Sequence, residues 1–264
     1  MDEKGFVEGV RRYMSQLREE KRYSSAKSYQ DALNSFIKYS GTENISYSDI
    51  NKANLHRYEA YLLEKIAERF PTHSVLGEES GMHEKNTDFC WVVDPLDGTN
   101  NYSQGLPVFT VSIGLQYRGH TLIGVVYAPY FDELYTAERG KGAFLNGRPL
   151  QVSAKTDLES CVLGTGFPYD KGTNPENNIA NLASILPGLR GIRRMGSAAY
   201  DLCCVAAGFL DGYWELNLNL WDVCAGELLV EEAGGCICPF RQDRHISIIA
   251  ANGVLVEKII HLIR

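Results

Sequence analysis

Two carboxylates follow an apolar segment in the middle of the chain. Residues 91–100 read WVVDPLDGTN, so Asp94 and Asp97 stand three positions apart directly after a run with strand character. Pro95 restricts the backbone between them, and Gly98 permits a close turn and the close approach of a phosphate group or a hydrated ion. Paired carboxylates at a strand end present the hard oxygen ligands that Mg²⁺ prefers, and Mg²⁺ retains waters that can become nucleophiles.

Further oxygen donors lie nearby in the sequence. The carbonyl of Leu96 and the hydroxyl of Thr99 could converge on the same point as the two aspartates. Glu78, in the run Gly77-Glu78-Glu79-Ser80, ends another apolar segment, and Asp222 stands at the predicted start of a helix as either an N-cap or a ligand. An Asp before Gly is also a common turn residue, so each acid has a structural explanation as well as a functional one.

The elements that must position these residues alternate between helix and strand. Apolar residues recur every three or four positions, as in amphipathic helices, over 6–19, 24–39, 48–70, 177–186, 197–208 and 221–233. Short apolar runs bounded by turn residues predict strands over 74–77, 90–93, 110–116, 121–127, 134–138 and 143–147, and near 162, 213 and 248. Asn146-Gly147 predicts a hairpin turn. This order predicts a layered α/β fold.

Composition sets the class of protein. The 264 residues are 44% hydrophobic and 22% charged, as in a folded globular protein. No run approaches the roughly 18 apolar residues of a membrane span, and residues 1–20 are too charged for a signal peptide, so we expect a cytoplasmic protein without membrane contact. The seven cysteines include no CxxC pair, which favours reduced, buried thiols over a metal or redox role.

Several motifs resemble, in order and spacing, the signatures of the inositol monophosphatase family. They are Gly77-Glu78-Glu79-Ser80, the DPLDGT run over 94–99, WDVCAG over 221–226, and EEAGG over 231–235. Shorter stretches such as Thr165-Gly166-Phe167-Pro168 and Gly196-Ser197-Ala198-Ala199 also look like that family. The resemblance covers residues 64–264 and implies a phosphatase domain with the αβαβα sandwich that the family shares with fructose-1,6-bisphosphatase.

The resemblance also implies roles for individual residues. The metal ligands would be Glu78, Asp94, the Leu96 carbonyl, Asp97 and Asp222. The catalytic residues would be Glu78, Thr99 and Asp97, with Thr99 and Glu78 orienting and deprotonating the attacking water. The substrate contacts would be Gly98, Thr99, Gly196, Ser197, Ala198 and Glu215, although Glu215 could instead be an exposed strand carboxylate. The family further implies two or more Mg²⁺ ions, lithium sensitivity, a small phosphorylated polyol as substrate and a homodimer.

Residues 1–63 do not show the family's usual Asp-x-Val-Thr-x-x-Asp segment, whose metal-binding acid would fall at Leu55. Their helical spacing and aromatic residues are instead similar to the SAM-like core-binding domain of phage-integrase-type tyrosine recombinases. Net charges of +1 for residues 1–63 and −8 for the remainder also separate the two parts. The segment could be a natural fusion, a substitute for the family's first helices or an artificial junction. Its basic residues could contact DNA phosphates, but a solvated helical face explains them more simply.

Four functions remain open within this interpretation. The favoured one is hydrolysis of myo-inositol 1-phosphate to inositol and phosphate by a metal-activated water. Fructose-1,6-bisphosphatase and nucleotide 3′-phosphatase activities belong to the same superfamily. The alternative from another class is a DNA-binding or interaction protein whose phosphatase domain is inactive.

Overall fold

The computed structural model describes residues 15, 18–19 and 52–263, and the chain divides into two compact units between Pro71 and Thr72. In the first unit, α3 (Lys52–Arg69) is continuous through residue 63, where the sequence resemblance changes. It ends just before Pro71, which disfavours helical geometry in the preceding residue. The helices predicted over 6–19 and 24–39, with their possible DNA contacts, lie almost wholly outside the described residues. None of the described helices is long and apolar enough to cross a membrane.

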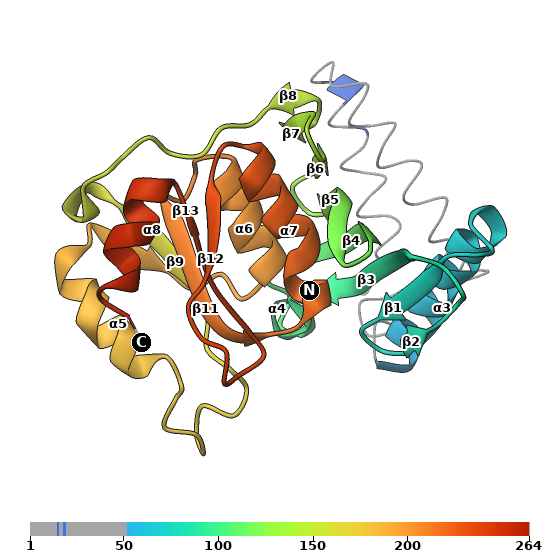
Figure 1. The fold of residues 1–264 in the computed structure, drawn as a ribbon, viewed down its shortest axis with the longest axis horizontal. Helices are drawn as coiled ribbons and strands as arrows, with labels where there is room; N and C mark the ends of the chain where they lie inside the picture. Colours follow the sequence, from blue (N-terminus) through green and yellow to red (C-terminus); the bar gives the residue numbers. More distant parts are fainter. Residues whose placement is uncertain (1–14, 16–17, 20–51, 264) are drawn as a thin grey trace. The chain divides into compact units, whose positions relative to one another are not determined.

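The second unit contains two sheets (Figure 1). The larger has eight strands in the order β2-β1-β3-β4-β5-β6-β7-β8 and is antiparallel except for the parallel pair β1 and β3. Its strands are β1 (Ser74–Gly77), β2 (Gly81–His83), β3 (Phe89–Asp97), β4 (Thr110–Tyr117), β5 (His120–Ala128), β6 (Glu133–Glu138), β7 (Gly142–Leu145) and β8 (Arg148–Pro149). The parallel pair places the ends of β1 and β3 at the same edge, and with them Glu78 and Asp94.

The smaller sheet has five strands in the order β10-β9-β11-β13-β12. Its strands are β9 (Val162–Thr165), β10 (Gly191–Arg193), β11 (Gly212–Leu218), β12 (Cys236–Pro239) and β13 (Ile246–Ala251). The α-helices of the second unit are α4 (Thr99–Ser103), α5 (Ile179–Ile185), α6 (Ala198–Ala206), α7 (Leu220–Glu232) and α8 (Gly253–Ile260), with short 3₁₀ turns η2 (Leu158–Ser160) and η3 (Leu186–Gly188). The layered α/β class predicted from the sequence is confirmed.

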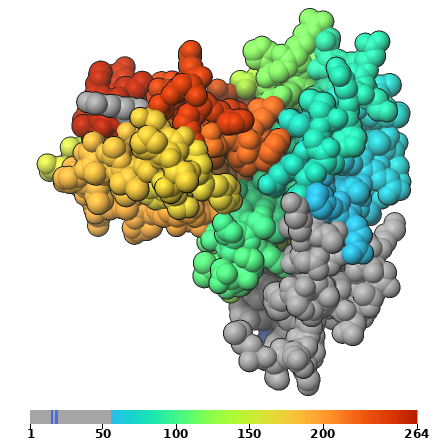
Figure 2. Space-filling model, turned by 90° about the horizontal axis from the view of Figure 1, so that it is seen from below, coloured from blue at the N-terminus to red at the C-terminus, as the bar shows by residue number. Residues whose placement is uncertain are grey.

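The helices of the second unit form two layers. Helices α6 and α7 pack between the two sheets, and α5 and α8 cover the other face of the smaller sheet (Figure 1). The inner core joins side chains of α6, α7 and both sheets, whereas the outer core joins Ile185 of α5 and Leu255 of α8 to Trp214 of β11. In the space-filling view, the yellow to orange residues around position 180 accordingly lie next to the red residues near the C-terminus (Figure 2).

Local sequence signals account for several boundaries. Ser197 caps α6, and its Oγ accepts a hydrogen bond from the Tyr200 amide. Asn252 caps α8 in the same way through the Leu255 amide. Asn146 and Gly147 both have positive φ, 49° and 78°, between β7 and β8, as a two-residue hairpin turn of this kind requires. The hairpin prediction is therefore confirmed.

Close approach of α7 to the larger sheet depends on two strand glycines. A Cβ atom at Gly114 of β4 would lie 2.6 Å from Cys224 Sγ, and one at Gly124 of β5 would lie 2.7 Å from the Ala225 carbonyl oxygen. Any side chain at Gly124 would therefore meet helix backbone and push the helix away from the strands, whereas one at Gly114 would first displace the Cys224 side chain. These glycines set the height of α7, and hence of Asp222, above the sheet.

The seven cysteines are free. Four of them, Cys161, Cys203, Cys204 and Cys224, are buried, as the sequence predicts. Cys236 and Cys238 lie on the same face of β12, but Cys236 is exposed because this strand is the edge of the smaller sheet. The expectation of burial is wrong for Cys236.

Glu227, in the middle of α7, is half-buried, and burial together with the charge of Glu231 raises its pKa from 4.5 to about 7. The folded state therefore binds this proton more tightly than the unfolded state, and the resulting stability is lost as the pH rises from about 4.5 through 7. We expect Glu227→Gln to melt at the wild-type temperature at pH 4 to 5. At pH 8 it should be more stable than wild type, by about 1–3 kcal/mol.

Thermal melts at both pH values measure this difference. Glu257→Gln, on the exposed side of α8, is the matched control and should melt like the wild type at each pH. A Glu227→Gln protein no more stable than wild type at pH 8 would show that the Glu227 carboxylate is not destabilised by its surroundings.

Candidate metal centre

An irregularity in β3 places the two aspartates of the central motif. In the register with β4, Asp94 pairs with Ser112 and Asp97 with Thr110, so β3 holds one extra residue between them. Pro95 lies at this bulge, where its missing N–H costs no ladder hydrogen bond. The Leu96 amide donates to Asp94 Oδ1 at 2.8 Å, and Thr99 Oγ1 donates to the Leu96 carbonyl at 2.9 Å. The bulge therefore fixes Asp94 and the Leu96 carbonyl together.

The start of α6 orients Asp97 from a distant part of the sequence. The Ser197 hydroxyl donates to Asp97 Oδ2 at 2.6 Å, and the Ala199 amide donates to the same oxygen at 2.8 Å. Since Ser197 is also the N-cap of α6, one residue both begins the helix and fixes the carboxylate. A helix N-terminus also favours negative charge.

Asp222 is held at the start of α7. Sequence reasoning left N-cap and ligand open, but the N-cap is Asn219, and Asp222 stands at position N3 of a capping box. The Asn219 amide donates to Asp222 Oδ2 at 2.7 Å. One oxygen of Asp222 is thereby engaged by the helix end, and the other remains available to the site.

The fold brings Asp94, Asp97 and Asp222 into one cluster, in which one carboxylate oxygen of each lies within 4.8 Å of the others. Glu78, at the end of β1, interacts with this cluster through a side-chain hydrogen bond to Asp94. Burial, and then the neighbouring carboxylates, raise the pKa of Asp94 well above its usual value. Burial, and then the charge of the neighbouring Asp222, raise the pKa of Asp97. Burial raises the pKa of Asp222 to about 6.

The donor set fits divalent cations of the hard, oxygen-preferring type. Its oxygens are carboxylates with a backbone carbonyl nearby, and no sulfur or imidazole ligand is part of the cluster. Within residues 52–263, no basic side chain forms an ion pair with Asp94, Asp97 or Asp222. Buried negative charges without a partner are costly, so a cation would relieve the repulsion.

The residues expected to contact substrate lie around this cluster. Gly98 has a φ of 92° and begins α4, and a Cβ there would lie 2.9 Å from the Val108 carbonyl oxygen. Gly196 has a φ of 83° and leads into Ser197 and Ala198 at the start of α6. Glu215 of β11 is half-buried, and its carboxylate accepts a hydrogen bond from the Tyr213 hydroxyl. Burial raises the pKa of Glu215 to about 7, with smaller contributions from Asp97 and Asp222, so the exposed-strand alternative does not describe it.

Sequence reasoning did not single out three residues around this site. Asn101 is buried and donates from Nδ2 to the carbonyls of Met195 (2.6 Å) and Val108 (2.8 Å), which ties the loop before α6 to the loop after α4. Arg194 acts electrostatically on both Glu215 and Asp201. Asp201 is buried, with one carboxylate oxygen unbonded. No local pattern marked these three, because their partners are remote in sequence.

The fold is a layered α/β structure with a cluster of carboxylates at strand and helix ends that could hold a metal ion. Comparisons with known proteins specify the family. The sequence model of the inositol monophosphatase family matches residues 15–264, which include most of residues 1–63, the part whose sequence is also similar to a recombinase domain. The chain belongs to the inositol monophosphatase family.

Individual relatives agree with this assignment. The Nus factor SuhB of Pasteurella multocida is 41% identical over 246 residues, covering 90% of this chain and 90% of that protein. The inositol-1-monophosphatase of Synechocystis sp. is 46% identical over 183 residues, covering 69% of this chain and 64% of that protein. The solved structure of an inositol monophosphatase from Anabaena (Nostoc) sp. matches with a TM-score of 0.74 and 42% identity, covering 77% of this chain and 83% of that one.

Proposed function

We propose that this protein is a Mg²⁺-dependent phosphomonoesterase that hydrolyses phosphate esters of small polyols, with myo-inositol 1-phosphate as the preferred substrate. The observation that carries the proposal is the convergence of Asp94, Asp97 and Asp222 within 4.8 Å, without a basic partner in the described part of the chain. Divalent cations in such a site neutralise charge on a phosphate ester and activate a water molecule for in-line attack.

Each carboxylate in this proposal has a distinct position. Asp94 is the buried ligand at the centre of the cluster, Asp97 and Asp222 bind beside it, and Glu78 and the Leu96 carbonyl complete the set. Hydrogen bonds orient the three aspartates before a cation arrives. The Leu96 amide donates to Asp94, the Ser197 hydroxyl and Ala199 amide donate to Asp97, and the Asn219 amide donates to Asp222. Loss of a hydrogen bond that orients a metal ligand usually lowers metal affinity or activity.

Thr99 and Glu78 are suited to handle the attacking water. The Thr99 hydroxyl donates its hydrogen bond to the Leu96 carbonyl, so its oxygen can accept a hydrogen bond from water. Glu78 is exposed at the end of β1 and bonded to Asp94, where it can take the proton. Gly98, Gly196, Ser197, Ala198 and Glu215 are proposed to bind the phosphate and polyol hydroxyls.

A substrate comparison tests the activity. We expect phosphate release from myo-inositol 1-phosphate that requires Mg²⁺ and stops in EDTA, with a kcat/KM well above those for fructose 1,6-bisphosphate and 3′-AMP. A higher value for either of the other two esters would reassign the substrate within the superfamily. Release that persists unchanged in EDTA would contradict the metal site.

Lithium provides an independent measurement. Membership in the family implies that Li⁺ enters the metal site, so we expect millimolar LiCl to remove most of the activity. The same concentration of KCl should leave the activity nearly unchanged, which separates a specific effect from ionic strength. Equal responses to the two salts would argue against lithium binding at this site.

The names of several relatives support a second candidate. Proteins named Nus factor SuhB, including one 41% identical to this chain, suggest a role as a Nus factor that need not involve hydrolysis. Failure of every ester to turn over in saturating Mg²⁺ would favour this role. A cytoplasmic location, a homodimer and the DNA contacts of the N-terminal segment remain predictions.

A further inference from the structure

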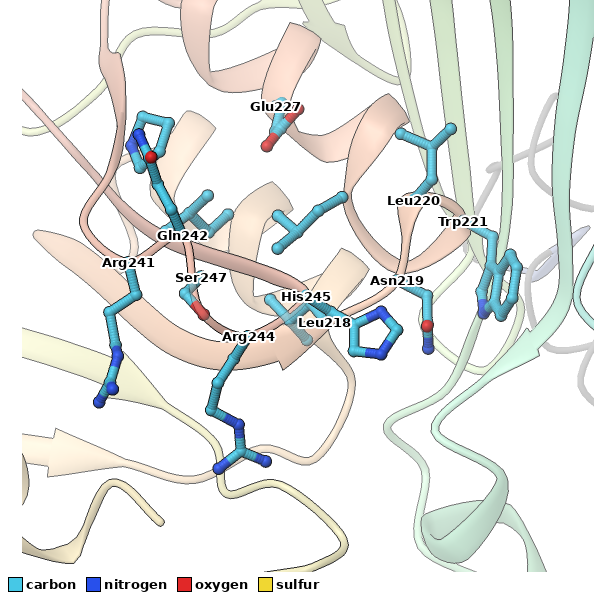
Figure 3. Close-up of a pocket in the computed structure, with 13 residues that line it drawn as sticks. Leu218, Asn219, Leu220, Trp221, Glu227, Arg241, Gln242, Arg244, His245 and Ser247 are labelled. Atoms are coloured by element: carbon cyan, nitrogen blue, oxygen red, sulfur yellow. The ribbon is translucent and has the colours of Figure 1, made fainter. Parts of the chain in front are cut away.

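A hollow of about 730 Å³ lies between α7 and the β12–β13 hairpin (Figure 3). Its lining includes Asn219 and Trp221 at the start of α7 but none of the three aspartates of the metal centre. Its walls are formed largely by apolar side chains at the ends of β11 and β13 and the start of α7, including Leu218, Leu220, Ile246 and Ile248. This volume falls within the range of about 300–1,000 Å³ that is typical of small-molecule sites, which combine apolar walls with a few polar groups.

The two arginines of this pocket have acidic partners, whereas its glutamate has no basic partner among the described residues. Arg241 pairs with Glu176 and, at 2.6 Å, with Asp243, and Arg244 pairs with Asp170 at 2.7 Å. Glu227 also lines the pocket, yet it forms no hydrogen bond or ion pair with any residue of 52–263. Figure 3 shows Glu227 projecting from α7 on one side, while the guanidinium groups of Arg241 and Arg244 extend away from it. The unpaired acid or arginine of the pocket, within the described residues, is therefore the Glu227 carboxylate.

Trp221 adds a second unsatisfied group to the lining. Its indole Nε1 is buried and has no hydrogen-bond partner in the described structure. Its ring offers a flat apolar and π-electron surface, which suits an aromatic or cationic ligand. The lining has one carboxylate, and apart from the indole its uncharged polar groups are amide, hydroxyl and imidazole side chains. A single carboxylate is a poor site for Ca²⁺ or Mg²⁺, which require several oxygen ligands.

We propose that this pocket binds a small organic ammonium ion, whose charged nitrogen pairs with Glu227 and whose apolar body contacts Leu218, Ile246 and Ile248. The proposal concerns a site separate from the phosphatase centre and stands or falls independently of it. An anionic ligand is disfavoured because both arginines of the lining already have acidic partners.

Indole resonances of the full chain provide the measurement. The protein has three tryptophans; Trp91 Nε1 donates to His73 and Trp214 Nε1 donates to Asn178, so only the Trp221 signal reports on the pocket. Spectra at pH 8 would be followed while 2-phenylethylammonium chloride is added, and in parallel with 2-phenylethanol, which has the same body without the charge. Ionic strength is held constant with NaCl.

We expect the ammonium probe to shift the Trp221 signal saturably, with a Kd of about 1 mM or lower, and the alcohol to bind at least about tenfold more weakly. Glu227→Gln should reduce the affinity for the ammonium probe to that for the alcohol and leave the alcohol's affinity unchanged. The matched variant Glu257→Gln, an exposed carboxylate on α8, should retain the wild-type preference.

Two results would overturn the proposal. One is equal affinity for the two probes, which would show a merely apolar pocket. The other is a Trp221 signal that neither probe moves at concentrations about tenfold above the expected Kd. Because the comparison of the probes uses the wild-type protein, it decides the question even if Glu227→Gln does not fold.

Discussion

Asp94→Asn is expected to reduce phosphate release by at least about 100-fold in saturating Mg²⁺, the scale on which a single electrostatic group at a reacting centre acts. Asp94 is buried, and it is the residue through which Glu78 joins Asp97 and Asp222. Asparagine keeps the size of the side chain and can still accept the bond from the Leu96 amide, but it removes one negative ligand from the cluster.

The same variant should remain folded. Without cations, the neutral asparagine is not repelled by the three other acids, so we expect Asp94→Asn to melt at or above the wild-type temperature in EDTA. Asp88→Asn, just before β3 on the surface, is the control, since its ion pair with Arg118 is exposed and contributes little to stability. Retention of more than roughly a tenth of the wild-type turnover by Asp94→Asn would contradict its place as a metal ligand.

Gly124→Ala is expected to destabilise the second unit by about 2–3 kcal/mol, because added volume in a tightly packed region forces backbone movement. The new Cβ would lie 2.7 Å from the Ala225 carbonyl oxygen and 3.1 Å from its Cα, so the obstacle is helix backbone and not a flexible side chain. Thermal unfolding should therefore occur roughly 5–10 °C below the wild type.

This substitution should also impair catalysis in the molecules that stay folded. Helix α7 carries Asp222 three residues before Ala225, and displacement of the helix moves Asp222 away from Asp94 and Asp97. A misplacement of about 1 Å can cost roughly 100-fold in rate. The activity, measured well below the melting temperature, should fall by at least about tenfold on that basis.

Gly188→Ala is the matched control for Gly124→Ala. Gly188 ends η3, has no positive φ and has no atom within 4 Å of a Cβ built on it. It should melt at the wild-type temperature or slightly above, because alanine restricts the unfolded chain. If both variants melt alike, close packing of α7 on β5 does not limit stability.

Local sequence determined much of the fold and part of the site. Asn146-Gly147 specified its turn because both residues tolerate positive φ, and Ser197 specified the start of α6 because its hydroxyl can cap a helix. The pair Asp94 and Asp97 could be identified as candidate ligands because the strand, the proline and the acids are contiguous. Such features depend on neighbours a few residues apart and can be read directly along the chain.

Asp222 and Glu227 show what only the tertiary structure decided. Whether Asp222 reaches Asp94, 128 positions away in the sequence, depends on how closely α7 lies on the sheet, and Gly114 and Gly124 set that height through contacts with Cys224 and Ala225. Glu227 stands on the same helix and looks like an ordinary surface glutamate in the sequence. Its burial against the β12–β13 hairpin, and with it the pocket, results from packing between elements that no local pattern specifies.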